Sequence, residues 1–516
     1  MQLTNAFPLA HIEPSLRELL PADLYAAAWL DPSPETLTDV FHHLRTLRYI
    51  LQDYVPRQVA QSRPKPGQIT YQWQEGAFIF TDLSGFTPLM EATAPFGKEG
   101  AVTLHNVLNG YFASMIEIIS LSGGTVLEFT GDAMLALFRA GDSQRSMEMA
   151  VRAGLRMQRS MQENFAEIET PGSTHTLAMR VGIHPGRFFR ADIGTPRRME
   201  HVLLGQAVRK TKRAEAAGVK GRVCVTEEGF ALAAERFRFE DGEPGHKLVV
   251  DDFSADELGE YDITMKTRRP GGAVLFDRSV DGLVHEIEDA LQNCQPLASY
   301  MPRPILTLLV ESASERAVPA EFMESTVMFA NLVGLAEIID EATPDEERSL
   351  VSLFSQILTL INAAVEARGG ILKQVTYHLS GSDIMIFFGV PTAHSNDSLR
   401  AAEAALIVRD IITNLKVTTG QGEEVELSCE IGLARGPVFA AEVGEPRGRR
   451  EYNIQGDTVN TAARLMVKAP KNEIWMTEGV YEDIQAHFDC TNLGIISLKG
   501  KSATKPIYRL NHPIED

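Results

Sequence analysis

Asp82 has the sequence surroundings of a residue that binds a metal ion carrying phosphates. It ends an apolar, β-branched and aromatic run, residues 78–81, that predicts a buried strand, and the small-residue turn Ser84-Gly85 and a helical segment follow. A carboxylate beside a turn with free backbone N–H groups suits such an ion. An acid at this place can also cap the next helix, so both interpretations stay open here.

The composition narrows the class of protein. The chain has 516 residues, enough for two to four domains, and 49 basic against 69 acidic residues give a net charge of −20. This charge argues against general nucleic-acid binding and against attachment to an acidic membrane surface. An anionic ligand must therefore be held by a local cationic pocket or by a metal.

The sequence predicts a cytoplasmic protein. We find no apolar run long enough to span a bilayer, and the segment after Met1 lacks the basic region of a signal peptide. The four cysteines have no metal-site spacing and are typical of reduced, buried thiols. They are Cys224, Cys294, Cys429 and Cys490.

The order of predicted elements is the ferredoxin-like order. Residues 1–65 are predicted to be mostly helical, with one helix that stops at about Leu20 before Pro21 and another over about 37–54, and residues 62–67 resemble a linker. The strand at residue 78 is followed by a helix over about 98–120, hairpin strands at 125–129 and 134–138, a helix over about 143–166, a strand over 177–184 and a helix from 205 to 218. Strand, helix, two strands, helix and strand make an α+β domain.

The second half of the chain repeats the first with an offset of about 246 to 251 residues. The matched pairs are Tyr54-Val55-Pro56-Arg57 with Tyr300-Met301-Pro302-Arg303, the strand at 78 with that at 327, Gly123-Gly124 with Gly369-Gly370, the strand at 179 with that at 428, and Gly205 with Gly456. We therefore predict a helical segment over 1–65, one domain over 66–270, a linker with helices over 271–320 that includes a helix at 281–293, and a second domain over 321–516.

These motifs resemble the class III nucleotidyl cyclases. The resemblance covers roughly residues 70 to 265 and 320 to 512, and it is closest to the tandem catalytic domains of soluble adenylyl cyclases, because of the Tyr-x-Pro-Arg segments and the segment 203–208. It implies two ferredoxin-like domains paired head to tail about a pseudo-twofold axis. Their active sites form at the interface, with metal ligands from one domain and base-binding groups from the other.

The resemblance implies that Asp82 and Asp132 bind two Mg²⁺ or Mn²⁺ ions. Asp132 lies in a predicted hairpin turn, so neighbouring strands can bring both carboxylates to one point; the alternative is a plain Gly-Asp turn. Attack of a ribose 3′-hydroxyl on the α-phosphorus of a nucleotide needs an activated alkoxide and a stabilised leaving group, which two metals provide. The turn from Ser84 and Gly85 to Phe86 and Thr87 would then lie against the phosphates.

Two cationic residues match the phosphate-binding groups of the family. Arg180 lies within an apolar strand, where an unpaired guanidinium is costly to bury; a phosphate would pair it, and a structural carboxylate would do so equally well. Lys499 is the corresponding group from the second domain, and its alternative is a solvated surface lysine.

The second domain carries the segment that is most diagnostic of the family, residues 451–464. Asn460 matches the residue that orients the ribose, and Arg464, four residues later on the same helix face, matches the one that stabilises charge on the phosphate in the transition state. Lys373 matches the lysine that donates to adenine. Asn453 stands where adenylyl cyclases more often carry Asp or Thr, but an amide oxygen still accepts from the amino group. Guanylyl cyclases carry Glu at the lysine position, so ATP is favoured over GTP.

The mirror-image site lacks the catalytic groups. Asn331 and Ser382 stand at the two metal positions, although the adjacent Asp383 complicates that alignment. In the first domain, Glu128 replaces the base-reading lysine, Val202 replaces the amino-group acceptor and Arg209 replaces the asparagine. Only the arginine is retained, as Arg213. An amide and a hydroxyl do not hold two metals without carboxylates, so we expect one catalytic centre per chain.

The degenerate site is either a regulatory anion pocket or a silent remnant. In the soluble adenylyl cyclases that this chain resembles, the corresponding place binds bicarbonate. Arg209, Lys212 and Arg213 supply positive charge here, whereas Glu128 repels an anion or pairs with an arginine.

The resemblance therefore implies an adenylyl cyclase, a lyase that makes cyclic AMP from ATP at a site formed within one chain. The alternatives are a guanylyl cyclase, a nucleotide-binding regulatory module without turnover, and a scaffold that binds a protein partner through residues 1–65.

Overall fold

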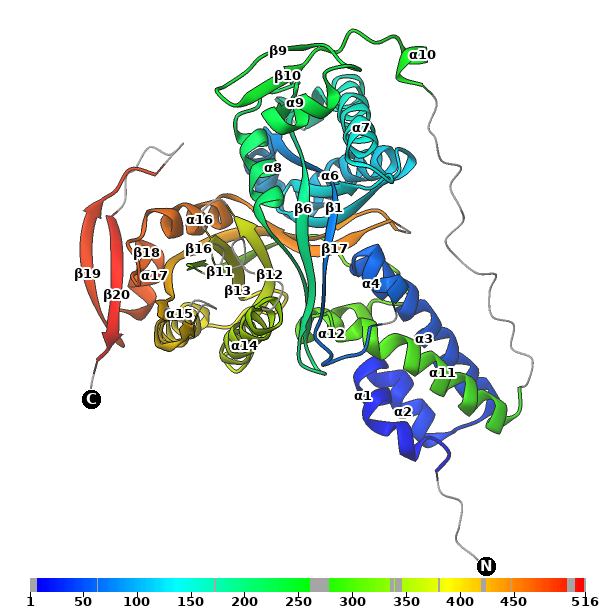
Figure 1. The fold of residues 1–516 in the computed structure, drawn as a ribbon. Helices are drawn as coiled ribbons and strands as arrows, with labels where there is room; N and C mark the ends of the chain where they lie inside the picture. Colours follow the sequence, from blue (N-terminus) through cyan, green and yellow to red (C-terminus); the bar gives the residue numbers. More distant parts are fainter. Residues whose placement is uncertain are drawn as a thin grey trace, which may run out of the picture.

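The computed structural model contains two similar eight-stranded sheets and a separate group of helices (Figure 1). The structure describes residues 7–62, 64–170, 173–259, 278–334, 338, 346–378, 381–418, 424–446, 448–498 and 506–514. Each sheet belongs to one half of the repeat, so the chain has the predicted α+β fold in tandem.

The first half is built around a sheet with the strand order β2-β3-β1-β6-β8-β10-β9, in which β7 also pairs with β6. Its strands are β1 (Thr70–Ser84), β2 (Gly124–Thr130), β3 (Ala133–Phe138), β6 (Ala178–Gly194), β7 (Met199–Leu204), β8 (Val223–Thr226), β9 (Phe239–Asp241) and β10 (His246–Val249). Its helices are α5 (Phe86–Thr93), α6 (Gly97–Leu121), α7 (Ser143–Asn164), α8 (Gln206–Ala216), α9 (Glu227–Ala233) and α10 (Ala255–Leu258), and β4 (Glu167–Thr170) and β5 (Ser173–Thr176) form a separate hairpin.

The second half repeats this topology with the order β12-β13-β11-β16-β18-β20-β19 and with β17 beside β16. Its strands are β11 (Glu321–Val333), β12 (Ile371–His378), β13 (Gly381–Phe388), β16 (Ser428–Gly444), β17 (Arg450–Gln455), β18 (Ile474–Thr477), β19 (Phe488–Ile495) and β20 (Pro506–Pro513). Its helices are α14 (Glu347–Glu366), α15 (Asp397–Asn414), α16 (Asp457–Lys468) and α17 (Glu478–Ile484), and β14 (Lys416–Thr418) pairs with β15 (Glu424–Glu426).

Two strands in each half extend far beyond the predicted ones and form an arm. β1 and β6 pair without interruption from Ser84 and Ala178 to Thr70 and Asp192, so the strands predicted at 78 and 177–184 are only their buried parts. The extension is polar on its exposed side and lacks the apolar run that the prediction used. In Figure 1 the first arm reaches toward α12, and β16 and β17 of the second half cross beside β1 and β6.

The helical group joins both ends of the first half. It contains α1 (Glu13–Leu19), α2 (Ala22–Leu30), α3 (Pro34–Tyr54), α4 (Arg57–Ser62), α11 (Val280–Ala298) and α12 (Arg303–Glu311). α3 and α11 lie side by side (Figure 1), and their apolar faces share one core, with Leu44 and Leu51 from α3 and Ile287 and Leu291 from α11. The linker predicted around residues 62–67 follows the short helix α4. Each Tyr-x-Pro-Arg segment leads into a helix, α4 or α12, and its proline stands just before the first turn.

Two expectations from the sequence, that all four thiols are buried and that no segment is apolar enough to span a bilayer, need qualification. All four cysteines are free thiols, but Cys490 is partly exposed while the other three are buried. In the described part of the chain, α14 is the one helix long and apolar enough to cross a membrane. Leu350, Phe354 and Ile361 of this helix lie in the protein core, and a core helix passes the same test.

Candidate active site at the interface of the two halves

Asp82 does not cap the helix that follows it. β1 ends at Ser84, and Gly85, with a φ of 98°, is the N-cap residue of α5 without any side-chain cap. A Cβ at Gly85 would lie 2.4 Å from the carbonyl oxygen of Thr176, so only glycine fits this turn. The turn brings the start of α5, with Phe86 and Thr87, next to the Asp82 end of the strand.

Asp132 lies next to Asp82, as the hairpin predicted. β1 pairs with β3 through Thr81 and Met134, which places the β2–β3 turn beside the end of β1. Burial, followed by the negative charge of Asp82, raises the pKa of the Asp132 carboxyl to about 7. Two adjacent carboxylates that repel each other fit a divalent cation, whose charge would relieve the repulsion.

Arg180 faces Asp82 across the sheet. The two residues are partners in the pairing of β1 with β6, and Arg180 Nη2 lies 2.8 Å from Asp82 Oδ2. The guanidinium Nε lies 2.8 Å from Oε1 of Glu215 on α8. Burial, followed by the charge of Asp82, raises the pKa of Glu215 to about 7. The structural carboxylate that the sequence left open is thus present, and phosphate binding by Arg180 stays a prediction.

The second half directly contacts the turn that carries Asp132, the predicted metal-binding turn. The side-chain amide of Gln455, on β17, donates to the carbonyl oxygen of Gly131 at 2.9 Å, and the amide nitrogen of Asn453 lies 3.5 Å from the same oxygen. Asn453 is buried, and its side-chain oxygen accepts from the backbone N–H of Ile454. The predicted base-reading residue therefore lies beside the turn that carries Asp132.

Lys373 is held by a carboxylate that the sequence did not identify. Its Nζ lies 2.5 Å from Oε2 of Glu451, and the other oxygen of Glu451 pairs with Arg449. Arg449 in turn donates to the carbonyl oxygen of Tyr54, at the end of α3, at 2.5 Å. A chain of side chains therefore connects the predicted adenine lysine to the helical group.

α16 presents Asn460 and Arg464 beside the first half. Asn460 is exposed, Arg464 is half-buried, and within the described residues the Arg464 side chain forms no hydrogen bond or ion pair. A Cβ at Gly456, just before α16, would lie 3.0 Å from the methyl group of Met90 on α5, so α16 starts against the helix that follows Asp82. Lys499 lies outside the described residues.

The mirror-image site has lost its phosphate arginine as well as its acids. The strand pairing sets Asn331 opposite Glu430, where the first half has Asp82 opposite Arg180, and Asn331 Nδ2 donates to Glu430 at 2.9 Å. The pairing of β11 with β13 sets Ser382 opposite Leu332. Counting on from the pair Thr81 and Met134 of β1 and β3, the corresponding position in the first half is that of Asp132. The register thus favours the alignment of Ser382, and not Asp383, with the second acid.

Lys212 and two acids fill the centre of this degenerate site. Burial raises the pKa of Glu128 and lowers that of Lys212, and each charge partly offsets the shift of the other. Burial also raises the pKa of Asp383 to about 7, against the opposing charge of Lys212. Thr376 from the second half donates to Glu128 at 3.4 Å. Two acids around one lysine disfavour a bound anion.

Comparisons with known proteins agree with this architecture. Adenylate cyclase type 10 of Oryctolagus cuniculus is 23% identical over 432 residues, which are 81% of this chain and 25% of that protein. An adenylate cyclase of Mycobacterium tuberculosis (strain ATCC 25618 / H37Rv) is 29% identical over 231 residues, 45% of this chain and 48% of the relative. The chain spans about a quarter of the length of its type 10 relatives.

A solved structure shares the fold over most of the chain. It is that of a class III adenylyl cyclase-like ATP-binding protein from Pseudomonas aeruginosa, with a TM-score of 0.54 and 13% identity over 85% of this chain and 92% of that one. The family described as "Adenylate and Guanylate cyclase catalytic domain" matches residues 70–246 and 318–512, the two segments that form the two sheets. The chain therefore belongs to the adenylate and guanylate cyclase catalytic domain family.

Proposed function

We propose that this chain is an adenylyl cyclase that converts ATP to 3′,5′-cyclic AMP and pyrophosphate at one centre between its two halves. The observation that carries the proposal is the contact of Gln455 and Asn453 with Gly131, which joins the predicted base-reading strand to the predicted metal-binding turn. The names of the type 10 relatives support the same activity.

The residues of this centre divide the work of the reaction. Asp82 and Asp132 would hold two divalent cations, Mg²⁺ or Mn²⁺, which would neutralise negative charge and favour deprotonation of the ribose 3′-hydroxyl. Arg180 exchanges Asp82 and Glu215 for the phosphates of the nucleotide, and the amides of the turn from Ser84 to Thr87 point at the same groups.

The second half positions the nucleoside. Lys373 and Asn453 contact the adenine edge, Asn460 orients the ribose, and Arg464 stabilises the negative charge that develops on the α-phosphate. Lys499 is proposed as a further phosphate ligand. All of these groups belong to one chain, so we propose that catalysis needs no second copy. We also propose that the protein acts in the cytoplasm, as its composition predicts.

The proposal is tested by incubating purified protein with ATP or GTP and with Mg²⁺ or Mn²⁺, beside Asp82→Ala and the surface control Arg348→Gln. We expect cyclic AMP from the wild type and from Arg348→Gln, and none from Asp82→Ala. Cyclic GMP as the main product would favour the guanylyl cyclase alternative. Binding of an ATP analogue without product under every condition would favour a regulatory module.

A further inference from the structure

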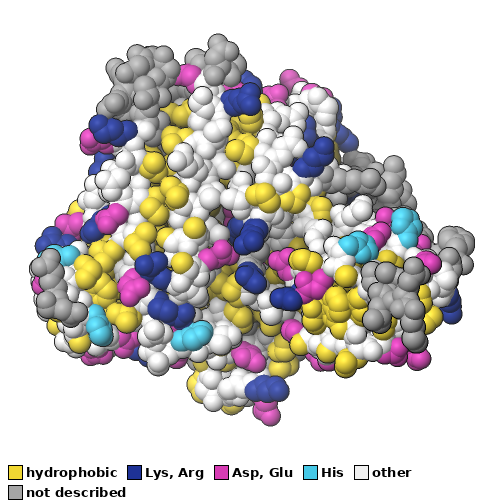
Figure 2. All heavy atoms as spheres, turned by 90° about the horizontal axis from the view of Figure 1, so that it is seen from below, with side chains coloured by type: hydrophobic (Ala, Val, Ile, Leu, Met, Phe, Trp, Pro, Cys, Tyr) yellow, Lys and Arg dark blue, Asp and Glu magenta, His cyan; other side chains and the backbone are white. Residues whose placement is uncertain are grey.

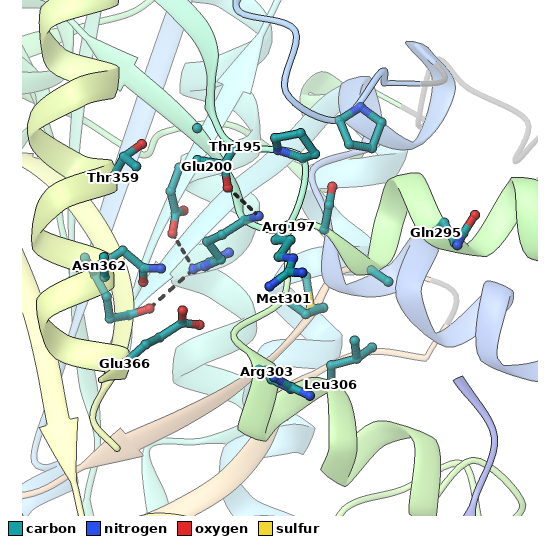
Figure 3. Close-up of a pocket in the computed structure, with 18 of the residues that line it drawn as sticks. Thr195, Arg197, Glu200, Gln295, Met301, Arg303, Leu306, Thr359, Asn362 and Glu366 are labelled. Carbon is teal, nitrogen blue, oxygen red and sulfur yellow. Dashed lines mark hydrogen bonds and ion pairs between the residues drawn. The ribbon is translucent and has the colours of Figure 1, made fainter. Parts of the chain in front are cut away.

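A large cavity lies where the two halves meet the helical group. It has a volume of about 730 Å³, within the range of small-molecule sites, and it is separate from the proposed active site. Its walls come from the loop after β6, from α14 and from helices α1, α11 and α12. In Figure 3, Thr359, Asn362 and Glu366 of α14 lie on one side and Gln295 of α11 on the other.

Two arginine side chains that are exposed to solvent line this cavity. Arg197 belongs to the loop after β6 and Arg303 begins α12, and both are labelled in Figure 3. Within the described residues neither side chain forms a hydrogen bond or an ion pair. The neighbouring Arg198 differs, since its two terminal nitrogens donate to the carbonyl oxygens of Tyr300 and Met199 and pair with Glu200.

The polar wall of α14 is not required by the fold. Gly123 and Gly369 correspond in the repeat, so Asn362 on α14 occupies the position of Ile116 on α6. On the α6 side the loop of the second arm packs closely, because a Cβ at Gly448 would lie 3.1 Å from Ile116. On the α14 side, Asn362 lines an open cavity instead.

We propose that this cavity binds a small metabolite that carries one carboxylate or phosphate together with hydroxyl or amino groups. Arg197 and Arg303 pair with the oxyanion, which guanidinium groups do with paired hydrogen bonds. Thr359 and Asn362 bond the neutral part of the ligand. Glu366 disfavours a second negative charge and accepts a hydrogen bond from a donor group.

The position of the cavity links its occupancy to catalysis; this step rests on the proposed function. Leu372 lines the cavity, accepts a hydrogen bond from Arg198 at 3.3 Å, and directly precedes the adenine lysine Lys373. A ligand here contacts the helical group and both halves at once. Because binding favours the conformation that binds, the ligand stabilises the arrangement in which the helical group and both halves are in contact.

The test measures the thermal midpoint of the full chain against the concentration of inorganic phosphate, with sodium chloride added to keep ionic strength constant. The variants are the double substitution Arg197→Gln and Arg303→Gln, and the control Arg348→Gln, which removes an exposed arginine outside the cavity. Neither cavity arginine has a partner among the described residues, so the double variant should have a normal midpoint without phosphate.

We expect phosphate to raise the midpoint of the wild type and the control, and to raise that of the double variant by less than a third as much. Equal shifts in all three proteins, or no shift in the wild type, would overturn the proposed site. The measurement needs no turnover, so its failure is distinct from failure of the proposed cyclase activity. In the cyclase assay, phosphate also acts at the active centre, which all three proteins share. The link to Lys373 predicts that the effect of phosphate on the rate differs between the double variant and the other two proteins, and an equal effect in all three would refute it.

Discussion

At the scale of residues, the pairing of Asp82 with Arg180 shows that the centre holds its own charges before a nucleotide arrives. The guanidinium lies between Asp82 and Glu215, so one cation already offsets two acids. A triphosphate with its cations would exchange these partners, because the metals neutralise the carboxylates while phosphate takes the arginine. Glu215 then helps to set the equilibrium between Arg180 paired with carboxylates and Arg180 paired with phosphate.

Glu451 is expected to position Lys373 for ATP. Glu451→Gln removes the carboxylate 2.5 Å from the lysine and should lower kcat/KM for ATP by about 10-fold, because an unanchored lysine samples other rotamers. The measurement is steady-state kinetics of Glu451→Gln, Lys373→Met and the double variant. If Glu451 acts through the lysine, the double variant loses no more than Lys373→Met alone. Additive losses would show that Glu451 acts by another route.

We expect bicarbonate not to activate the proposed cyclase activity. Glu128 and Asp383 surround Lys212 in the degenerate site, and their negative charge opposes a bound anion. Cyclic AMP formation should be equal with sodium bicarbonate and with sodium chloride at fixed pH. A saturable activation that disappears in Lys212→Met would contradict the expectation and would place the regulator in this site.

The sequence could predict candidate residues for the centre, but not the side chains that hold them. Asp82, Asp132, Asn460 and Arg464 lie in motifs whose order along the chain is diagnostic. Glu215, Glu451 and Gln455 have no such motif, and they reach the site only through the register of their strands or the packing of their helices. The alignment of Ser382 likewise needed the pairing of β11 with β13.

At the scale of elements, the arms are the part of the fold that the sequence did not predict. Residues 70–77 of β1 carry mainly polar and exposed side chains, so their pattern differs from that of a core strand. They form a strand because β6 pairs with them over its whole length. Pairing partners far apart in sequence override local propensity here. The buried run at 78–81, by contrast, was predictable from its composition.

His184 on β6 is expected to make stability depend on pH. It is buried and bonded to the Thr226 hydroxyl at 2.8 Å, and Thr226 also caps α9. Burial, with a smaller effect of Lys210, lowers the pKa of His184 to about 4, whereas an unfolded histidine has a pKa of about 6.5. The unfolded chain therefore binds a proton that the folded chain does not, and stability falls as pH drops from about 6.5 toward 4.

The size of this effect follows from the two pKa values. Between pH 7.5 and 5.5 the histidine should remove about 1.4 kcal/mol of unfolding free energy. Urea denaturation at both pH values gives the change in unfolding free energy for the wild type and for His184→Gln. The difference between these two changes measures the contribution of His184, because the other titrating groups are common to both proteins. The same loss in both proteins would mean that His184 does not set the dependence.

At the scale of the whole molecule, each half clamps the helix that leads into the other. Arg449 of the second half holds the carbonyl oxygen of Tyr54 before the first half, and Arg198 of the first half holds that of Tyr300 before the second. The tyrosine hydroxyls donate across the same junctions, to Glu442 at 2.5 Å and to Asp192 at 3.2 Å. These crossed contacts fix the pairing of the halves within one chain.

Because the halves are clamped within one chain, two inactive chains should not restore each other. Asp82→Ala removes a proposed metal ligand of the first half, and Asn460→Ala removes the proposed ribose ligand of the second, so each chain would have one defective component of its single proposed centre. Mixed in equal amounts, they should make no more cyclic AMP than either alone, and the specific activity of the wild type should not change on dilution. If the centre formed between two chains, some mixed pairs would combine an intact first half with an intact second half, and activity would reappear and rise with total protein. That recovery would show that the clamps at Tyr54 and Tyr300 do not keep the halves together, whereas its absence supports a centre that each chain builds alone.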